Sequence, residues 1–131
     1  MRRPRHRPLL ALASVVTVAA GLAVHFLAPA GPVSDALGDV LYAALIALLV
    51  AFVAPRARCW ATGVIALAWC VGVELLQLTP LPSRWAVSFP PLRLAFGTGF
   101  SALDLFWYAA GVVLVVICRM HRGSRRARLE A

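Results

Sequence analysis

The sequence predicts an all-α protein, a four-helix transmembrane bundle that forms a single integral membrane domain over residues 1–131. Hydrophobic residues make up 62% of the chain and charged residues only 14%. Soluble domains average about 45–50% hydrophobic and about 25% charged residues. The hydrophobic residues gather in four runs, each near the roughly 20 residues that a helix needs to cross a bilayer. Most arginines lie between and beyond these runs, so the composition excludes an ordinary soluble domain.

The first predicted helix covers residues 9–27 and follows a basic segment, residues 1–8. This segment, the apolar run and Ala28-Pro29-Ala30 could form a secretory signal with its cleavage site. We favour a retained helix, because the run exceeds the usual signal core of about 7–15 residues and three more apolar runs follow. Small and polar residues recur on one face of this helix, which favours close packing against other helices: Ser14, Thr17, Gly21 and His25.

The second and third predicted helices cover residues 36–54 and 59–79, and a proline follows each of them. A short loop precedes the second helix, and a turn with Arg56 and Arg58 separates the two. Each helix has one face of small or polar residues that favours helix–helix contact. These residues are Ala43, Ala47 and Ala51 on the second helix, and Gly63, Cys70, Glu74 and Gln77 on the third.

Residues 80–99 are predicted to form an apolar, proline-rich outer loop between the third and fourth helices. A loop of about 20 residues is uncommon in a compact domain unless it is functional or disordered. This one is too apolar for a solvated linker, so we expect it to lie in the headgroup region or to dip back between the helices. The fourth predicted helix covers residues 100–118, and the basic tail, residues 119–131, is expected to fray.

The arginines predict the orientation in the membrane. Four at the N-terminus, two at the turn after the second helix and five in the tail place eleven on one side, whereas only Arg84 and Arg93 lie on the other. The positive-inside rule therefore predicts that both termini are cytoplasmic. The net charge of +8 is concentrated beside apolar segments rather than spread over a binding face, so nucleic acid is not an expected partner.

Three acidic residues are predicted to lie at one depth of the bundle. Asp39, Glu74 and Asp104 each fall about one turn inside the outer boundary, about 4–8 Å at helical rise. An acid in hydrocarbon costs a few kcal/mol, so each of them must face protein or water. One interpretation is an ion-pair cluster that docks the outer loop onto the bundle. The other is an outward-facing acidic pocket for a cationic or polyhydroxy headgroup, or a pair of acid/base residues.

The candidate ligand-binding residues share this depth or the loop above it. They are Asp39, Glu74, Gln77, Asp104, Tyr108, Arg84, Arg93 and His25.

Several short motifs together resemble the VanZ-like family, and more closely a branch of small bacterial membrane proteins known only as a domain of unknown function. They are Gly38-Asp39-Val40-Leu41-Tyr42, Glu74-Leu75-Leu76-Gln77, Arg84, Phe96-Gly97-x-x-Phe100 and Asp104-Leu105-x-x-Tyr108-x-x-Gly111. The resemblance spans about Pro8 to Cys118. It implies a multi-pass protein of the bacterial cytoplasmic (inner) membrane and, because VanZ is associated with teicoplanin resistance, work at the cell envelope.

Three functions are compatible with this sequence. The first is binding of a lipid or cell-wall precursor headgroup at the outer acidic pocket. The second is a membrane-embedded enzyme with Glu74 and Asp104 as acid/base pair, although no nucleophilic triad, metal-binding cluster or phosphate-binding glycine loop supports it. The third is a cation- or proton-coupled transporter subunit. We expect no cofactor and no metal. The expected partner is the lipid bilayer, a lipid-linked or headgroup ligand is a possible one, and the small-residue faces are compatible with a homo-oligomer.

Overall fold

The structure, a computed structural model, describes residues 7–97 and 99–129, and this part of the chain contains helices and no strands. The helices are α1 (Arg7–Leu27), α2 (Pro32–Val53), α3 (Cys59–Gln77), α4 (Leu81–Ser88), α5 (Leu92–Phe96) and α6 (Ala102–Leu129). Four of them are long and apolar enough to cross a membrane: α1, α2, α3 and the part of α6 up to Ser124. The predicted all-α bundle of four spanning helices is confirmed, and the chain is a small multi-pass membrane protein.

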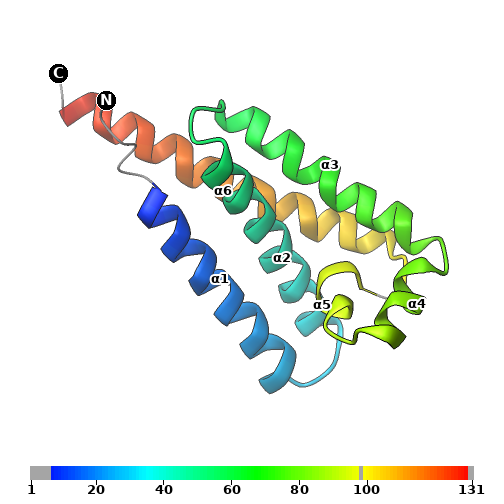
Figure 1. The fold of residues 1–131 in the computed structure, drawn as a ribbon. Coiled ribbons are helices and arrows are strands. Elements are labelled where there is room, and N and C mark those ends of the chain that lie inside the picture. The colour runs from blue at the N-terminus through cyan, green and yellow to red at the C-terminus, as the bar shows by residue number, and fades with distance from the viewer. Residues whose placement is uncertain (1–6, 98, 130–131) are drawn as a thin grey trace.

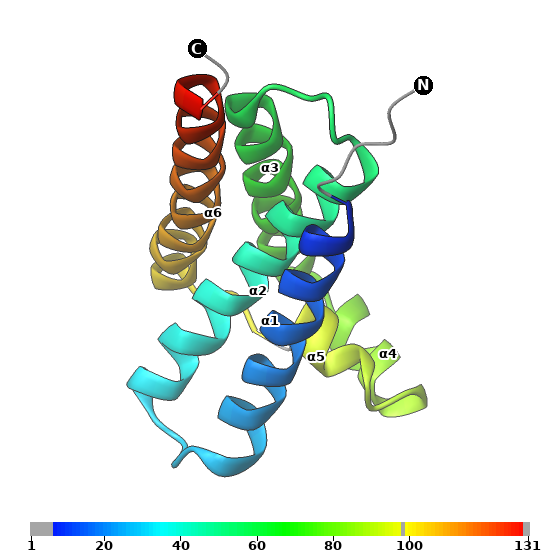
Figure 2. The same cartoon turned by 90° about the vertical axis from the view of Figure 1, so that its left-hand side faces the viewer.

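Helix α2 is the centre of the bundle. It packs against α1, α3 and α6, and α3 also packs against α6. The start of α1, the turn between α2 and α3 and the end of α6 lie at one end of the molecule (Figure 1). The turn between α1 and α2 lies at the opposite end together with α4 and α5, and we call this the α4–α5 end. Figure 2 shows α1 lying along the side of α2 that faces away from α6.

Helix α1 begins two residues before its predicted start, and α2 and α6 extend further beyond their predicted bounds. Helix α2 begins at Pro32 rather than at residue 36. Proline suits the first turn of a helix because its missing N–H has no partner there, and the Ser34 hydroxyl bonds to both backbone groups of Gly31 just before it. Helix α6 continues past residue 118 to Leu129, so the predicted fraying of the tail is wrong for this stretch. The tail is rich in arginine, a strong helix former, and contains no proline to stop the helix.

The predicted outer loop is not structureless, because it contains the short helices α4 and α5. Pro82 lies in the first turn of α4, where it is tolerated. The rings of Trp85 and Phe96 meet edge to face with centroids 5.9 Å apart and join α4 to α5. Gly97 ends α5 with φ 62°, a conformation that favours glycine. Residues 81–96 thus contain a pair of short helices at one end of the bundle.

The core of the bundle is built from small residues. Ala43, Ala47 and Ala51 have no exposed surface, as their predicted shared face requires. Helix α6 approaches α2 closely where Gly111 meets the backbone of α2. A Cβ atom on Gly111 would overlap the carbonyl oxygen of Val40. Small residues allow helix backbones to approach in membranes, where packing replaces the hydrophobic effect as the driving force.

We predict that Gly111→Ala lowers the free energy of unfolding in detergent by about 1–3 kcal/mol, because the added methyl group must push α6 away from α2. Gly72→Ala on α3 is the matched control, since nothing lies within 4 Å of a Cβ atom there. Thermal melts followed by circular dichroism would measure both. Equal stability of the two variants would contradict the close contact.

Candidate functional site

Glu74 is the most deeply buried charged side chain of the described residues, with 1% of its surface exposed. Its Oε1 atom accepts a hydrogen bond of 3.0 Å from the Tyr108 hydroxyl. Its Oε2 atom accepts one of 3.1 Å from the backbone N–H of Ser101. Ser101 directly precedes α6, where free N–H groups and the helix dipole favour a negative group. Glu74 therefore ties α3 to the first turns of α6.

Gln77, one turn further along α3, binds the C-terminal end of α5. Its amide Nε2 donates a hydrogen bond of 2.6 Å to the carbonyl oxygen of Phe96. A Cβ atom on Gly97 would lie 2.7 Å from this Nε2. The glycine thus lets the end of α5 approach α3. The Gln77 Oε1 atom is buried and accepts no hydrogen bond from the residues that the structure describes.

A cavity of about 1020 Å³ opens at the α4–α5 end between α1, α2, α5 and α6. The residues that give it its chemistry are Asp35, Asp39, Asp104, Arg93, His25, Gln77, Tyr42 and Tyr108. Pro90, Pro91 and apolar residues of α5 also line it. We call this space the acidic cavity, because three carboxyl groups and one guanidinium line it.

Asp39 of α2 and Asp104 of α6 both line the acidic cavity. The negative charges of Asp104 and Glu74 act on Asp39. Neighbouring carboxylates repel unless a proton or a cationic group lies between them. Tyr108 also lines the cavity and is 5% exposed. The arrangement can hold a positive group or several hydroxyl groups.

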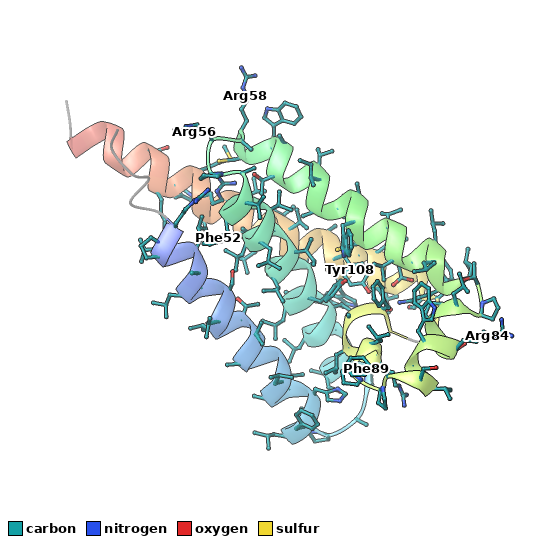
Figure 3. All side chains as sticks on the ribbon, in the orientation of Figure 1. Phe52, Arg56, Arg58, Arg84, Phe89 and Tyr108 are labelled. Carbon is teal, nitrogen blue, oxygen red and sulfur yellow. The ribbon has the colours of Figure 1, made fainter. Side chains whose placement is uncertain are left out.

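Six of the eight predicted site residues line the acidic cavity. They are Asp39, Gln77, Asp104, Tyr108, Arg93 and His25. Glu74 lies behind Tyr108 instead of on the cavity wall, because both of its oxygens are turned toward α6. Arg84 projects from α4 away from Tyr108 and the bundle interior (Figure 3). Glu74 receives its hydrogen bonds from Tyr108 and Ser101, so the ion-pair interpretation does not describe this carboxylate.

Three residues of the site are absent from the prediction. Asp35 lies in the first turn of α2 and is one of four acids that the sequence places near the outer boundary. Tyr42 follows Asp39 by one turn and accepts a hydrogen bond of 3.0 Å from Trp69 Nε1. Both residues lie about one helical turn from Asp39, and this spacing could have identified them as site residues. Ser101 acts through its backbone N–H, which no residue pattern encodes.

Within residues 7–97 and 99–129, no three His, Cys, Asp or Glu side chains come close enough together to hold a metal ion.

Comparison with known proteins finds one match. A family model described as a protein of unknown function (DUF2809) matches residues 29–112, which is more than half of the chain. No curated protein and no solved structure matches. The matched range begins just before α2 and ends within α6, so it includes Glu74, Gln77 and the carboxyl pair Asp39 and Asp104, while α1 lies outside it.

We predict that Tyr108→Phe lowers the free energy of unfolding by about 1–3 kcal/mol, since Glu74 Oε1 would remain buried without its donor. Ser83→Ala is the control, because that hydroxyl donates to Pro80 at an exposed position. Chemical or thermal unfolding in detergent would compare the two. A Tyr108→Phe protein as stable as Ser83→Ala would show that the Tyr108 hydroxyl contributes nothing to the fold.

Proposed function

Because the chain belongs to the DUF2809 family of proteins of unknown function, we infer its role from its own site and propose that it binds the headgroup of a lipid or cell-wall precursor in the acidic cavity. The observation that carries this proposal is that Asp39 and Asp104, from two spanning helices, line one cavity of about 1020 Å³. Acids within membrane spans are costly and mark functional sites by default.

The composition of the cavity wall favours a cationic or polyhydroxy group. Among the residues that the structure describes, three carboxyl groups and one guanidinium line the wall, those of Asp35, Asp39 and Asp104 and that of Arg93. Tyr42 and Gln77 add neutral hydrogen-bonding groups. Small polar ligands are usually oriented by a few such groups in a largely preformed space. A positive group beside the carboxyl pair would remove their mutual repulsion.

Binding is better supported than catalysis by Glu74 and Asp104. An acid/base residue must come within hydrogen-bond reach of the substrate, but Glu74 lies behind Tyr108 with both oxygens engaged. Glu74 is better suited to position Tyr108 and the start of α6. Asp39 and Asp104 are the acids that a ligand would contact.

We place the cavity on the outer side of a bacterial cytoplasmic membrane. The arginine asymmetry supports cytoplasmic termini, and the cavity lies at the end of the bundle away from them. The resemblance to the VanZ-like family supports work at the cell envelope. A headgroup ligand would then reach the cavity from the outer leaflet.

The ligand prediction uses paired variants. Wild-type protein purified in mild detergent should carry a bound lipid or precursor that mass spectrometry of the extract identifies. Asp39→Asn and Asp104→Asn should each lose most of it, because each removes a charge that faces the ligand. Arg93→Gln, on the cavity wall, should reduce the amount, whereas Arg84→Gln, on the same segment but outside the wall, should not. Equal ligand content in all five proteins would overturn the proposal.

The topology prediction uses a cysteine-free background. Single cysteines at exposed Ala30 and Ser83 should react with a membrane-impermeant maleimide on intact cells. A cysteine at exposed Ser124 should react only after the membrane is opened. The reverse labelling pattern would place the acidic cavity in the cytoplasm.

A further inference from the structure

An apolar groove of about 480 Å³ runs along the side of the bundle between α1 and α2. Thr17 and Gly21 of α1 and Leu45 and Ile46 of α2 line it, together with Trp69 of α3. The predicted small-residue face of α1 packs closely only near its start, where Ser14 is buried. From Thr17 onward this face borders the groove instead, since α1 has α2 as its main neighbour.

The groove runs parallel to the direction in which lipid chains lie in a bilayer. Its α1 side extends from Thr17 to His25, about 12 Å at the helical rise of about 1.5 Å per residue. Because α1 and α2 are both spanning helices, the groove follows the membrane normal from the middle of the bundle toward the α4–α5 end.

The groove and the acidic cavity adjoin each other. His25, Gly38 and Tyr42 line both spaces, and so do Pro91 and residues 94–96 of the α5 segment. Tyr42 lies at the junction, with its hydroxyl bonded to Trp69 on the groove side. One molecule can therefore occupy both spaces, with its polar part in the cavity and its apolar part in the groove.

We propose that the groove holds a hydrocarbon chain of the molecule whose headgroup fills the acidic cavity, and that this molecule is an aminophospholipid. This inference rests on the proposed function and names its ligand class. An ammonium group matches the carboxyl pair of Asp39 and Asp104. A phosphate matches the Arg93 guanidinium on the same wall. An anionic phospholipid without an amine would bring only negative charge to three carboxyl groups.

The headgroup provides the selectivity and the groove provides the orientation. A hydrocarbon chain gains little by leaving the bilayer for a protein groove, because lipid tails are as apolar as the groove wall. The charges at the cavity distinguish one lipid from another, since each would be poorly solvated at this depth. The chain keeps the headgroup at the level of the cavity.

The test compares ligands on the full-length protein in detergent, with binding read by native mass spectrometry and by the shift in melting temperature. Phosphatidylethanolamine should bind roughly tenfold more tightly than phosphatidylglycerol or N-acetylated phosphatidylethanolamine, which lack the ammonium charge. Glycerophosphoethanolamine, the same headgroup without chains, should produce no measurable shift. Equal binding of the three lipids would overturn the aminophospholipid assignment.

Groove-filling variants test the chain separately. A Cβ atom on Gly21 meets nothing within 4 Å, so Gly21→Leu can be accommodated while it fills the groove. It should weaken phosphatidylethanolamine binding by roughly tenfold. Gly72→Leu is the matched control on α3, outside the groove and equally open, and it should leave binding unchanged.

The outcomes separate this inference from the proposed function. If Asp39→Asn abolishes binding but Gly21→Leu does not, and glycerophosphoethanolamine binds as well as the lipid, the cavity binds a headgroup and the groove assignment is wrong. If Asp39→Asn leaves lipid binding intact, the proposed function itself fails. Loss of binding in both Asp39→Asn and Gly21→Leu, with Gly72→Leu unaffected, supports both.

Discussion

The buried carboxylate of Glu74 is the constraint on which the α4–α5 end of the molecule depends. A charged group in a membrane span must find polar partners within the protein, and Glu74 finds them in Tyr108 and in the backbone of Ser101. These two bonds fix the rotation of α6 against α3. They also position Asp104, which lies one turn before Tyr108 and therefore faces the same side of α6. The position of the acidic cavity thus depends on the hydrogen bonds of Glu74, although Glu74 does not line the cavity.

A second polar contact fixes the same two helices at their other end. Arg119 donates a hydrogen bond of 2.6 Å to the hydroxyl of Thr62, which is fully buried. Thr62 and Glu74 are separated on α3 by nearly the same number of residues as Tyr108 and Arg119 on α6, as antiparallel helices require. Gly111 lies between the two contacts and lets α6 approach α2. Polar bonds at both ends and a small residue in the middle replace the hydrophobic driving force that helices lack in a bilayer.

Helix α1 packs against fewer helices than α2, α3 and α6 do, and this looser packing leaves the space for a ligand. It packs mainly against α2, and only Leu10 and Ser14 near its start are buried. The rest of its small-residue face leaves the apolar groove open. The acidic cavity lies where this groove meets the folded 80–99 segment, so a polar space and an apolar space adjoin at one level. Helices α2 and α6, which pack against each other and against α3, carry the carboxyl groups, and α1 with α5 completes the walls.

The sequence by itself determined the four spans, because run length and proline positions act locally along the chain. It also identified six residues that line the acidic cavity. Only the tertiary structure decided that Glu74 turns away from this cavity, that Asp35 and Tyr42 join it, and that residues 80–99 fold into α4 and α5. Residue spacing defines which side chains share a helix face, but not how that face is rotated toward its neighbours. That rotation depends on contacts such as Tyr108 with Glu74 and Gly111 with Val40, between residues far apart in the chain.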